Sequence, residues 1–182
     1  PKEHVVKCLV QYHPDDTVAN RLDQEAQLLA LYDAVKHSGH ELLLEVIPPK
    51  RIPGDENTIV RAMKRLYNIG IYPEWWKLES LAPSQWSAVD ALIAERDPYC
   101  RGVVLLGLNA PMAELATSFR QAAASATCRG FMVGRTIFQE PSRRWLAGEV
   151  SDQELVAAAR ANFESLVSLW RHARNAATGR AA

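Results

Sequence analysis

Three charged residues interrupt segments of the chain that otherwise consist of apolar side chains, and they are the first candidates for chemistry. Lys7, Glu45 and Lys77 lie in VVKCLVQYH, ELLLEVI and EWWKLES, respectively. Lysine and glutamate are almost never fully buried unless they are paired, so each of the three needs a partner or a function. Side chains alternate along a strand, and neighbouring parallel strands lie about 4.8 Å apart. We therefore expect the three side chains to meet on one inner surface of a sheet.

A lysine in such a cluster can act as a nucleophile. A second lysine nearby, together with desolvation, would leave a fraction of the Lys77 amine neutral. A neutral amine attacks a ketone and forms a Schiff base, and a carboxylate beside it, here Glu45, can carry the protons. The alternative is a buried lysine–glutamate pair that only fixes the register of the strands. The residues alone leave both interpretations open.

The elements that would hold these residues alternate along the chain. Apolar runs predict buried strands over 5–13, 41–47, 74–80, 101–108 and 129–138. Apolar periodicity, caps and prolines predict helices over 17–36 and 58–68, after Pro83, after Pro111 and over 151–173. Repeated βα units at a spacing of about 30 residues are typical of a parallel α/β fold. Two architectures accept this order: part of a (β/α)8 TIM barrel, and an open, doubly wound sheet.

Residues 1–182 are interpreted as a single domain. An eight-stranded βα barrel typically needs about 250 residues, so five βα units cannot close one. The first expected strand begins within a few residues of Pro1. The sequence therefore predicts a partial barrel, namely strands four to eight of a longer domain. Such a fragment leaves two strand edges and an inner face uncovered, so we expect a homo-oligomer.

Composition excludes several classes of protein. Equal numbers of Lys+Arg and Asp+Glu, 21 of each, argue against a nucleic-acid partner. The apolar runs, such as Val103 to Leu106, are far too short to span a membrane, and no secretory signal is visible. Cys8, Cys100 and Cys128 have neither disulfide nor zinc spacing. We expect a cytoplasmic protein that binds no metal, no nucleic acid and no membrane.

A second set of candidates follows the last two expected strands. Gly107 ends one strand, and Gly134 and Arg135 lie near the end of the next. In βα barrels the loops at these positions often bind phosphate through backbone N–H groups and a helix N-terminus, and Arg135 would add a bidentate charge. The alternative is that Gly134 only makes room for packing and Arg135 pairs with a surface carboxylate.

His13 with Asp15 and Asp16 has two interpretations. The three side chains are possible ligands of a divalent ion, but HPDD is more often a turn that caps the following helix. We favour the turn. Motifs of serine hydrolases, dinucleotide-binding enzymes and P-loop proteins are absent from the sequence.

Several segments resemble a known enzyme family. LLLEVIPP, WWKLES and GFMVGRTIF resemble, in order and spacing, three late strands of class I (Schiff-base) aldolases of the tagatose-1,6-bisphosphate aldolase type, and VVKCLVQYHPDD resembles the strand before them. Residues 4–175 also resemble the aldolase-like C-terminal domains that are fused to bacterial 5-dehydro-2-deoxygluconokinases in myo-inositol catabolism. The resemblance implies a TIM barrel and a sugar kinase domain on the same polypeptide, N-terminal to this one.

The resemblance also implies roles for individual residues. Lys77 matches the lysine that forms the Schiff base, and Glu79 matches its companion. Glu45 matches part of the acid/base apparatus, and Lys7 matches the lysine of the preceding strand.

For the phosphate of the substrate, the resemblance points to Gly134 and Arg135. Gly107 and Asn109 stand where the family has a Ser/Gly-rich phosphate turn, so the sequence departs from the family there. They remain candidate phosphate-binding residues.

The implied reaction is the retro-aldol cleavage of 2-deoxy-5-keto-gluconate 6-phosphate to dihydroxyacetone phosphate and malonate semialdehyde. It needs no metal or organic cofactor, because the iminium accepts the electrons. This chain lacks the family's first three βα units, including an early-strand aspartate, so we expect it to be inactive alone. The alternative function is a non-catalytic module that binds a sugar phosphate or contacts the kinase.

Overall fold

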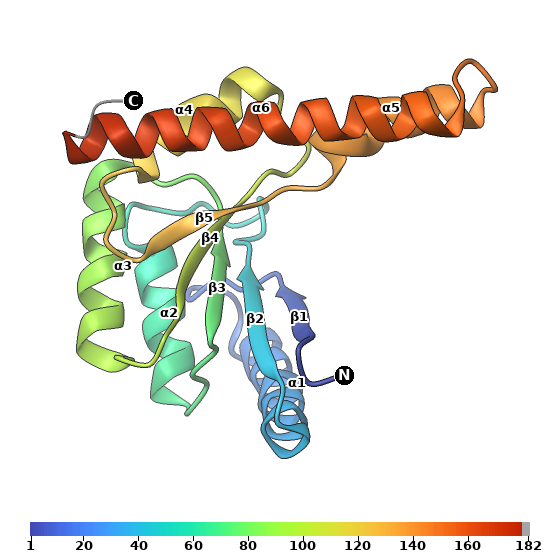
Figure 1. Ribbon diagram of the computed structural model, residues 1–182. Coiled ribbons are helices and arrows are strands. Elements are labelled where there is room, and N and C mark those ends of the chain that lie inside the picture. The colour runs from blue at the N-terminus through green and yellow to red at the C-terminus, as the bar shows by residue number, and fades with distance from the viewer. Residues whose placement is uncertain (180–182) are drawn as a thin grey trace. The chain divides into compact units, whose positions relative to one another are not determined.

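The computed structural model describes residues 1–179. It contains five strands: β1 (Val5–Val10), β2 (Glu41–Val46), β3 (Trp75–Leu78), β4 (Gly102–Leu106) and β5 (Cys128–Met132). The helices are α1 (Val18–Ser38), α2 (Thr58–Asn68), α3 (Pro83–Arg96), α4 (Met112–Ala122), α5 (Arg135–Leu146) and α6 (Asp152–Thr178). The strands form one parallel sheet in the order β1-β2-β3-β4-β5 (Figure 1).

The strand order distinguishes the two predicted architectures. A doubly wound sheet places its first strand between later ones, whereas here every strand pairs with its neighbours in sequence. The doubly wound alternative is therefore wrong. Sequential parallel order is compatible with part of a βα-barrel wall.

The fifth strand is shorter than predicted. It ends at Met132, and the segment predicted to continue it to residue 138 instead begins α5. The N–H groups of Ile137 and Phe138 both donate to the carbonyl oxygen of Gly134, which forms the first helical turn. The prediction failed because an apolar pair such as Ile137-Phe138 fits a strand and a helix equally well.

The helix termini follow the predicted sequence signals. Thr17 caps α1 by accepting a hydrogen bond from the Asn20 N–H, and α1 ends at Gly39, whose φ of 71° requires the left-handed conformation. Ser151 and Glu154 form a capping box at the start of α6, where the sequence predicts a helix from residue 151.

The chain divides into two compact units, each of which is described separately. The first comprises Pro1–Leu78 and Ser84–Val104, and the second comprises Glu79–Pro83 and the chain from Leu105 onward. The interpretation of the chain as a single domain stays a prediction.

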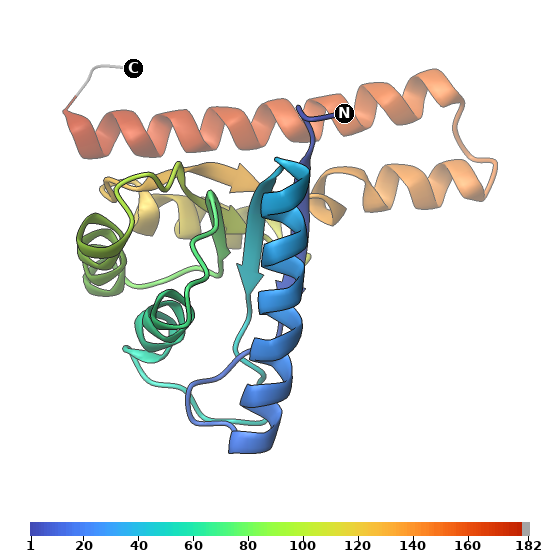
Figure 2. The same cartoon turned by 90° about the horizontal axis from the view of Figure 1, so that it is seen from below.

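In the first unit, α1, α2 and α3 cover one face of β1–β3 (Figures 1 and 2). The Tyr12 hydroxyl, just after β1, donates to Glu25 of α1 over 2.6 Å. The Trp76 indole N–H donates to the Tyr67 hydroxyl of α2 over 2.9 Å. Because side chains alternate along a strand, these contacts also determine which residues of β1 and β3 point to the opposite face.

An ion pair between a buried glutamate and a partly exposed arginine joins two of these helices. Glu25 is 4% exposed and accepts hydrogen bonds from Nε and Nη2 of Arg65 at 2.9 and 2.6 Å. Tyr12 donates to the same carboxylate. The guanidinium of Arg65 contributes most to lowering the pKa of Glu25 below its usual 4.5, and burial raises the pKa of Tyr12 to about 12.

In the second unit, aromatic rings join the sheet to two helices. Phe119 of α4 stacks on Phe131 of β5 with 5.0 Å between ring centroids, and contacts Trp170 of α6 edge-on at 5.6 Å. Phe131 in turn lies 6.2 Å from Phe163 of α6. Helices α5 and α6 form an antiparallel hairpin (Figure 1), in which the Asn162 side chain donates to the Ile137 carbonyl over 2.8 Å.

The two edge strands expose apolar side chains. Val5 and Leu9 of β1 are 43% and 46% exposed, and Met132 of β5 is 44% exposed. Unpaired strand edges with apolar side chains favour association with another chain. The expected homo-oligomer stays a prediction.

We predict that Arg65→Ala lowers the free energy of unfolding at pH 7 by about 3 kcal/mol, because it leaves the buried Glu25 carboxylate without its cationic partner. A carboxylate whose pKa is lower in the folded than in the unfolded state stabilises the fold above its unfolded pKa. That contribution disappears as the pH falls through the folded pKa. In urea titrations at several pH values, the difference between wild type and variant should therefore shrink below pH 4.5.

Arg61→Ala is the matched control, since Arg61 also lies on α2 but pairs with the exposed Asp15 and Asp55. We expect a clearly smaller loss of stability, because exposed ion pairs contribute little. Equal losses in the two variants would show that the pair of Glu25 and Arg65 has no special importance.

Candidate active site

Lys7, Glu45 and Lys77 lie together on the face of the sheet opposite α1–α3. The parallel register aligns Leu9 with Glu45 and Glu45 with Lys77. One carboxylate oxygen, Oε2 of Glu45, lies 2.5 Å from Lys7 Nζ and 3.3 Å from Lys77 Nζ. The expected meeting of the three side chains is therefore found, and their catalytic roles stay predictions.

The three side chains of the cluster differ in how far they are exposed to solvent. The side chains of Glu45 and Lys77 are 5% and 13% exposed, whereas that of Lys7 is 41% exposed. Two ammonium groups offset the cost of burying one carboxylate, and the cluster carries one excess positive charge. Glu45 is close enough to Lys77 to accept or return a proton. The arrangement can therefore supply an amine nucleophile with an adjacent base, and it can attract an anion.

A second polar contact on the same face was not expected from the sequence. The Trp75 indole N–H donates to Glu41 Oε2 over 3.0 Å, and Glu41 Oε1 pairs with Arg101 at 2.5 Å. Glu41 and Glu45 share a face because they are four residues apart on one strand. The four-residue spacing of Glu41 and Glu45 could have indicated that Glu41 lies on the same face. A glutamate at the start of a strand, however, resembles an ordinary surface residue.

The candidate phosphate-binding residues belong to the second unit. An ideal Cβ on Gly107 would lie 3.0 Å from the Val133 side chain, so any other residue here would require this side chain to shift by a few tenths of an ångström. The Thr136 hydroxyl donates to the Ala110 carbonyl over 2.9 Å, which joins the same two loops. Gly134 is the N-cap of α5, and the loops after β4 and β5 are thus brought together.

The turn after β4 is strained. Leu108 and Asn109 have φ angles of 43° and 66°, and the Ala110 N–H donates to the Gly107 carbonyl over 2.6 Å. A bulky residue such as leucine rarely adopts positive φ, and such a conformation costs of the order of 1–3 kcal/mol. Backbone strain of this kind is more frequent at functional sites than elsewhere. The residue types in this segment did not indicate the strained turn.

A cavity of about 360 Å³ lies beside this turn. Its wall includes Gly107 and Glu79, together with Glu114 from the first turn of α4, and none of its lining residues is basic. A phosphate inside it would face two carboxylates, so the cavity suits hydroxyl groups better than phosphate. Arg135 is the first residue of α5 and is exposed, and Asn109 is also exposed. The expected phosphate contacts stay predictions. The start of α5, with Arg135, is better suited to bind phosphate than the cavity.

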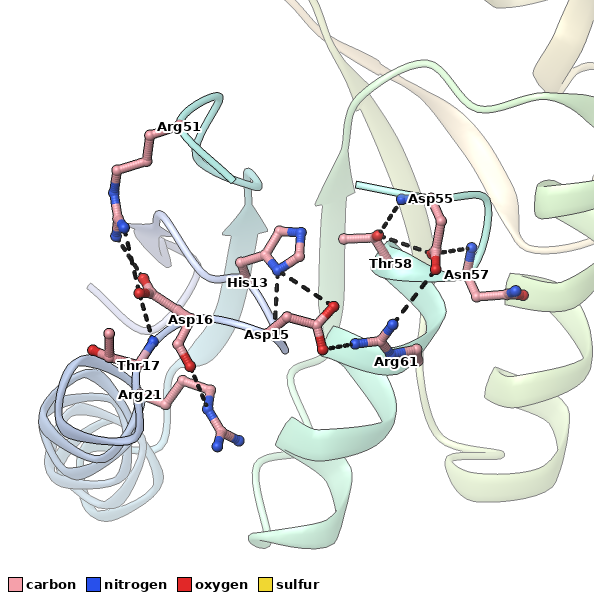
Figure 3. Close-up of polar contacts among 10 residues, drawn as sticks. All are labelled: His13, Asp15, Asp16, Thr17, Arg21, Arg51, Asp55, Asn57, Thr58 and Arg61. Atoms are coloured by element: carbon pink, nitrogen blue, oxygen red, sulfur yellow. Dashed lines mark hydrogen bonds and ion pairs between the residues drawn. The ribbon is translucent and has the colours of Figure 1, made fainter. Parts of the chain in front are cut away.

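The loop after β1 forms a network of ion pairs (Figure 3). Asp16 accepts a hydrogen bond from the Thr17 N–H at 2.7 Å and pairs with Arg51 at 2.5 Å, whereas Asp15 pairs with Arg61 of α2. Hydrogen bonds from Arg51 contribute most to lowering the pKa of Asp16 to about 2. This geometry agrees with the interpretation of HPDD as a turn before α1, and arginines already pair with both carboxylates. The cap of α1, however, is Thr17 and not a residue of HPDD.

His13 is fully buried beneath the same loop. Its Nδ1 accepts a hydrogen bond from the Asp15 N–H at 3.1 Å, and its Nε2 has no hydrogen-bond partner within the described chain. Across residues 1–179, no group of three or more histidine, cysteine, aspartate or glutamate side chains is arranged to hold a metal ion.

These features define a parallel α/β protein with a lysine–glutamate–lysine cluster on the open face of its sheet. The chain belongs to a family described as "uncharacterized protein conserved in bacteria (DUF2090)", whose sequence profile matches residues 1–174. None of the curated proteins is similar enough to match it. In the described part of the chain, no helix combines the length and the apolar character needed to cross a membrane.

The shared carboxylate leads to a prediction about stability. Lys7→Met and Lys77→Met should each cost little, because Glu45 keeps one cationic partner in either variant. The double variant should lose about 3 kcal/mol or more, well beyond the sum of the single losses, because it leaves a buried carboxylate unpaired. Urea unfolding of the four proteins measures the coupling, and additive losses would refute it.

Proposed function

We propose that this protein contains a Schiff-base (class I) aldolase domain of myo-inositol catabolism. The domain would cleave 2-deoxy-5-keto-gluconate 6-phosphate to dihydroxyacetone phosphate and malonate semialdehyde. The observation that carries the proposal is the 3.3 Å contact between Lys77 Nζ and the Glu45 carboxylate that Lys7 also holds. The substrate is suggested by the resemblance to kinase-fused aldolase-like domains. In this proposal β1–β5 are strands four to eight of a (β/α)8 barrel.

Lys77 would be the nucleophile. Its neutral amine attacks the ketone carbon of the substrate, and loss of water gives an iminium. Glu45 then removes the proton from the hydroxyl group two carbons away. The bond between the carbon that bears this hydroxyl group and the carbon next to the iminium breaks, and the hydroxyl oxygen becomes the aldehyde oxygen of malonate semialdehyde. The electrons of the broken bond move to the iminium to form an enamine. Protonation of the enamine and hydrolysis release the ketone product and restore the lysine.

Lys7 would act by its charge. Its ammonium group lies 2.5 Å from Oε2 of Glu45 and would remain as a cationic partner of this carboxylate when Lys77 becomes neutral. Lys7 is the most exposed member of the cluster, so it is also the one best placed to bind a substrate oxygen.

Phosphate would bind at the start of α5. The first N–H groups of a helix have no intrahelical partner and attract anions, and Arg135 adds a positive charge to the same turn. The neighbouring cavity, with Glu79 and Glu114 in its wall, would accept hydroxyl groups.

One observation favours a second candidate function. Glu45 and Lys77 are largely buried and already paired, which also suits a purely structural ion pair. In that case the domain would be a non-catalytic sugar-phosphate-binding module beside a sugar kinase. It would bind substrate through Arg135 but would form no covalent intermediate.

The sharpest test is covalent trapping. Sodium borohydride added during turnover of the full-length protein should attach the substrate to Lys77, since reduction converts the iminium into a stable amine. Mass spectrometry of peptides locates the modified lysine. Lys77→Arg should abolish trapping, because a guanidinium stays protonated. Glu45→Gln should lower kcat by about 10²- to 10⁴-fold yet leave slow trapping, because the nucleophile remains.

Lys7→Arg is the control for this test. It keeps the positive charge beside Glu45, so trapping on Lys77 should persist. Trapping on another lysine, or undiminished trapping in Lys77→Arg, would refute the assignment. Absence of any trapping, together with substrate binding, would support the non-catalytic module. The chain studied alone should show little turnover.

The phosphate contact has its own test. Arg135→Ala should raise the KM for the phosphorylated substrate by roughly 10- to 100-fold, with little effect on an unphosphorylated analogue, because a charge-assisted bidentate contact is lost. Arg143→Ala on the same helix is the control, since Arg143 pairs with Glu140. Equal effects on both substrates would exclude a specific role in phosphate binding.

A further inference from the structure

The outer face of α6 carries a shallow, open groove that the proposed catalytic function does not use. All of its lining residues come from this helix, so it is a helix surface and not an enclosed cavity. Phe163 and Val167 form its apolar part, and Glu164, Arg171 and His172 are among its polar residues. An open groove with an apolar stripe and flanking charges suits a second helix.

Phe163 is both exposed and held in place. Its side chain is 48% exposed, yet its ring contacts Phe131, which stacks on Phe119 in the aromatic cluster of the second unit. An aromatic side chain that is already ordered loses little conformational entropy on binding. Such residues commonly dominate the binding energy of protein interfaces.

The charges of the groove are self-complementary. Glu164 and Arg171 are seven residues apart, so they lie on one face of the helix about 10 Å from each other. Both are exposed; Glu164 pairs with Arg160, and Arg171 forms no ion pair within the described chain. A two-fold rotation about an axis between Val167 and Ser168 exchanges the positions of Glu164 and Arg171.

We propose that α6 of a second copy of this chain docks in this groove, antiparallel to the first. In this arrangement Glu164 of each copy pairs with Arg171 of the other, and the exposed part of Phe163 lies at the edge of the contact between the two helices. Each contact occurs twice, as in every two-fold symmetric interface.

Several features favour a second copy over an unrelated partner. The pattern of charges matches itself after the rotation, which a different partner would have no reason to do. The chain has no formal net charge, so two copies do not repel each other at a distance. A contact between single helices is smaller than the roughly 1,600 Å² of a standard interface, so we expect dissociation constants in the micromolar range.

Charge reversal tests the proposal on the intact chain. Sedimentation equilibrium between about 1 and 200 μM should show a dimer. Arg171→Glu and Glu164→Arg should each raise the dissociation constant at least about tenfold, because each variant turns two attractive contacts into two repulsive ones. The double variant E164R/R171E should restore the wild-type value to within about threefold. Lys64→Glu, an equal change of charge on an exposed residue of α2, should have no effect.

A second pair of variants tests the apolar part. Phe163→Ala should weaken the dimer, whereas Val156→Ala, at an exposed site of α6 outside the groove, should not. A monomer at every concentration would refute the proposal. A dimer that is indifferent to the α6 variants would also refute it, and would point instead to the strand edges or to another surface. Failure of the double variant to restore association would refute the proposed pairing of Glu164 with Arg171.

Discussion

The carboxylate of Glu45 is the constraint on which the first unit depends. An ionised carboxylate cannot remain in a sheet interior without compensation, and here the compensation comes from the strands on both sides. Lys7 reaches it from β1 and Lys77 from β3, so the cluster holds three strands in one register. A shift of any strand by one residue would move its charged side chain to the helix-covered face. The same contacts that fix the register therefore place an amine beside a base.

The opposite face of the sheet determines which side the cluster occupies. There, hydroxyl and indole groups bind α1 and α2: Tyr12 binds Glu25, and Trp76 binds Tyr67. Each of these polar groups is satisfied within the layer between sheet and helices, where an unpaired donor would be costly. Because the even-numbered residues of β3 face the helices, Trp75 and Lys77 must face away from them. The arrangement of the candidate site is thus a consequence of packing on the other side.

The sequence was sufficient for those parts of the structure that depend on local periodicity. Alternation within the strands and sequential strand order were enough to bring Lys7, Glu45 and Lys77 together. Caps such as Ser151 with Glu154 also follow from short-range hydrogen bonding. The end of β5 was predicted wrongly, because apolarity does not distinguish Ile137-Phe138 in a strand from the same pair in a helix. The turn at Leu108 and the acidic wall beside Gly107 could not be predicted, since both depend on how separate segments come together.

The sequential order of the strands also has a consequence for how the sheet assembles. Val5 aligns with Glu41, and Leu43 aligns with Trp75, so each pairing closes a segment of similar length. The entropy lost in closing such a segment grows only slowly with its length, and none of these pairings requires a distant part of the chain. Each βα unit can add to the one before it as soon as it has been synthesised. Within β1–β5, folding can therefore proceed strand by strand during translation, because each strand pairs with the one synthesised just before it.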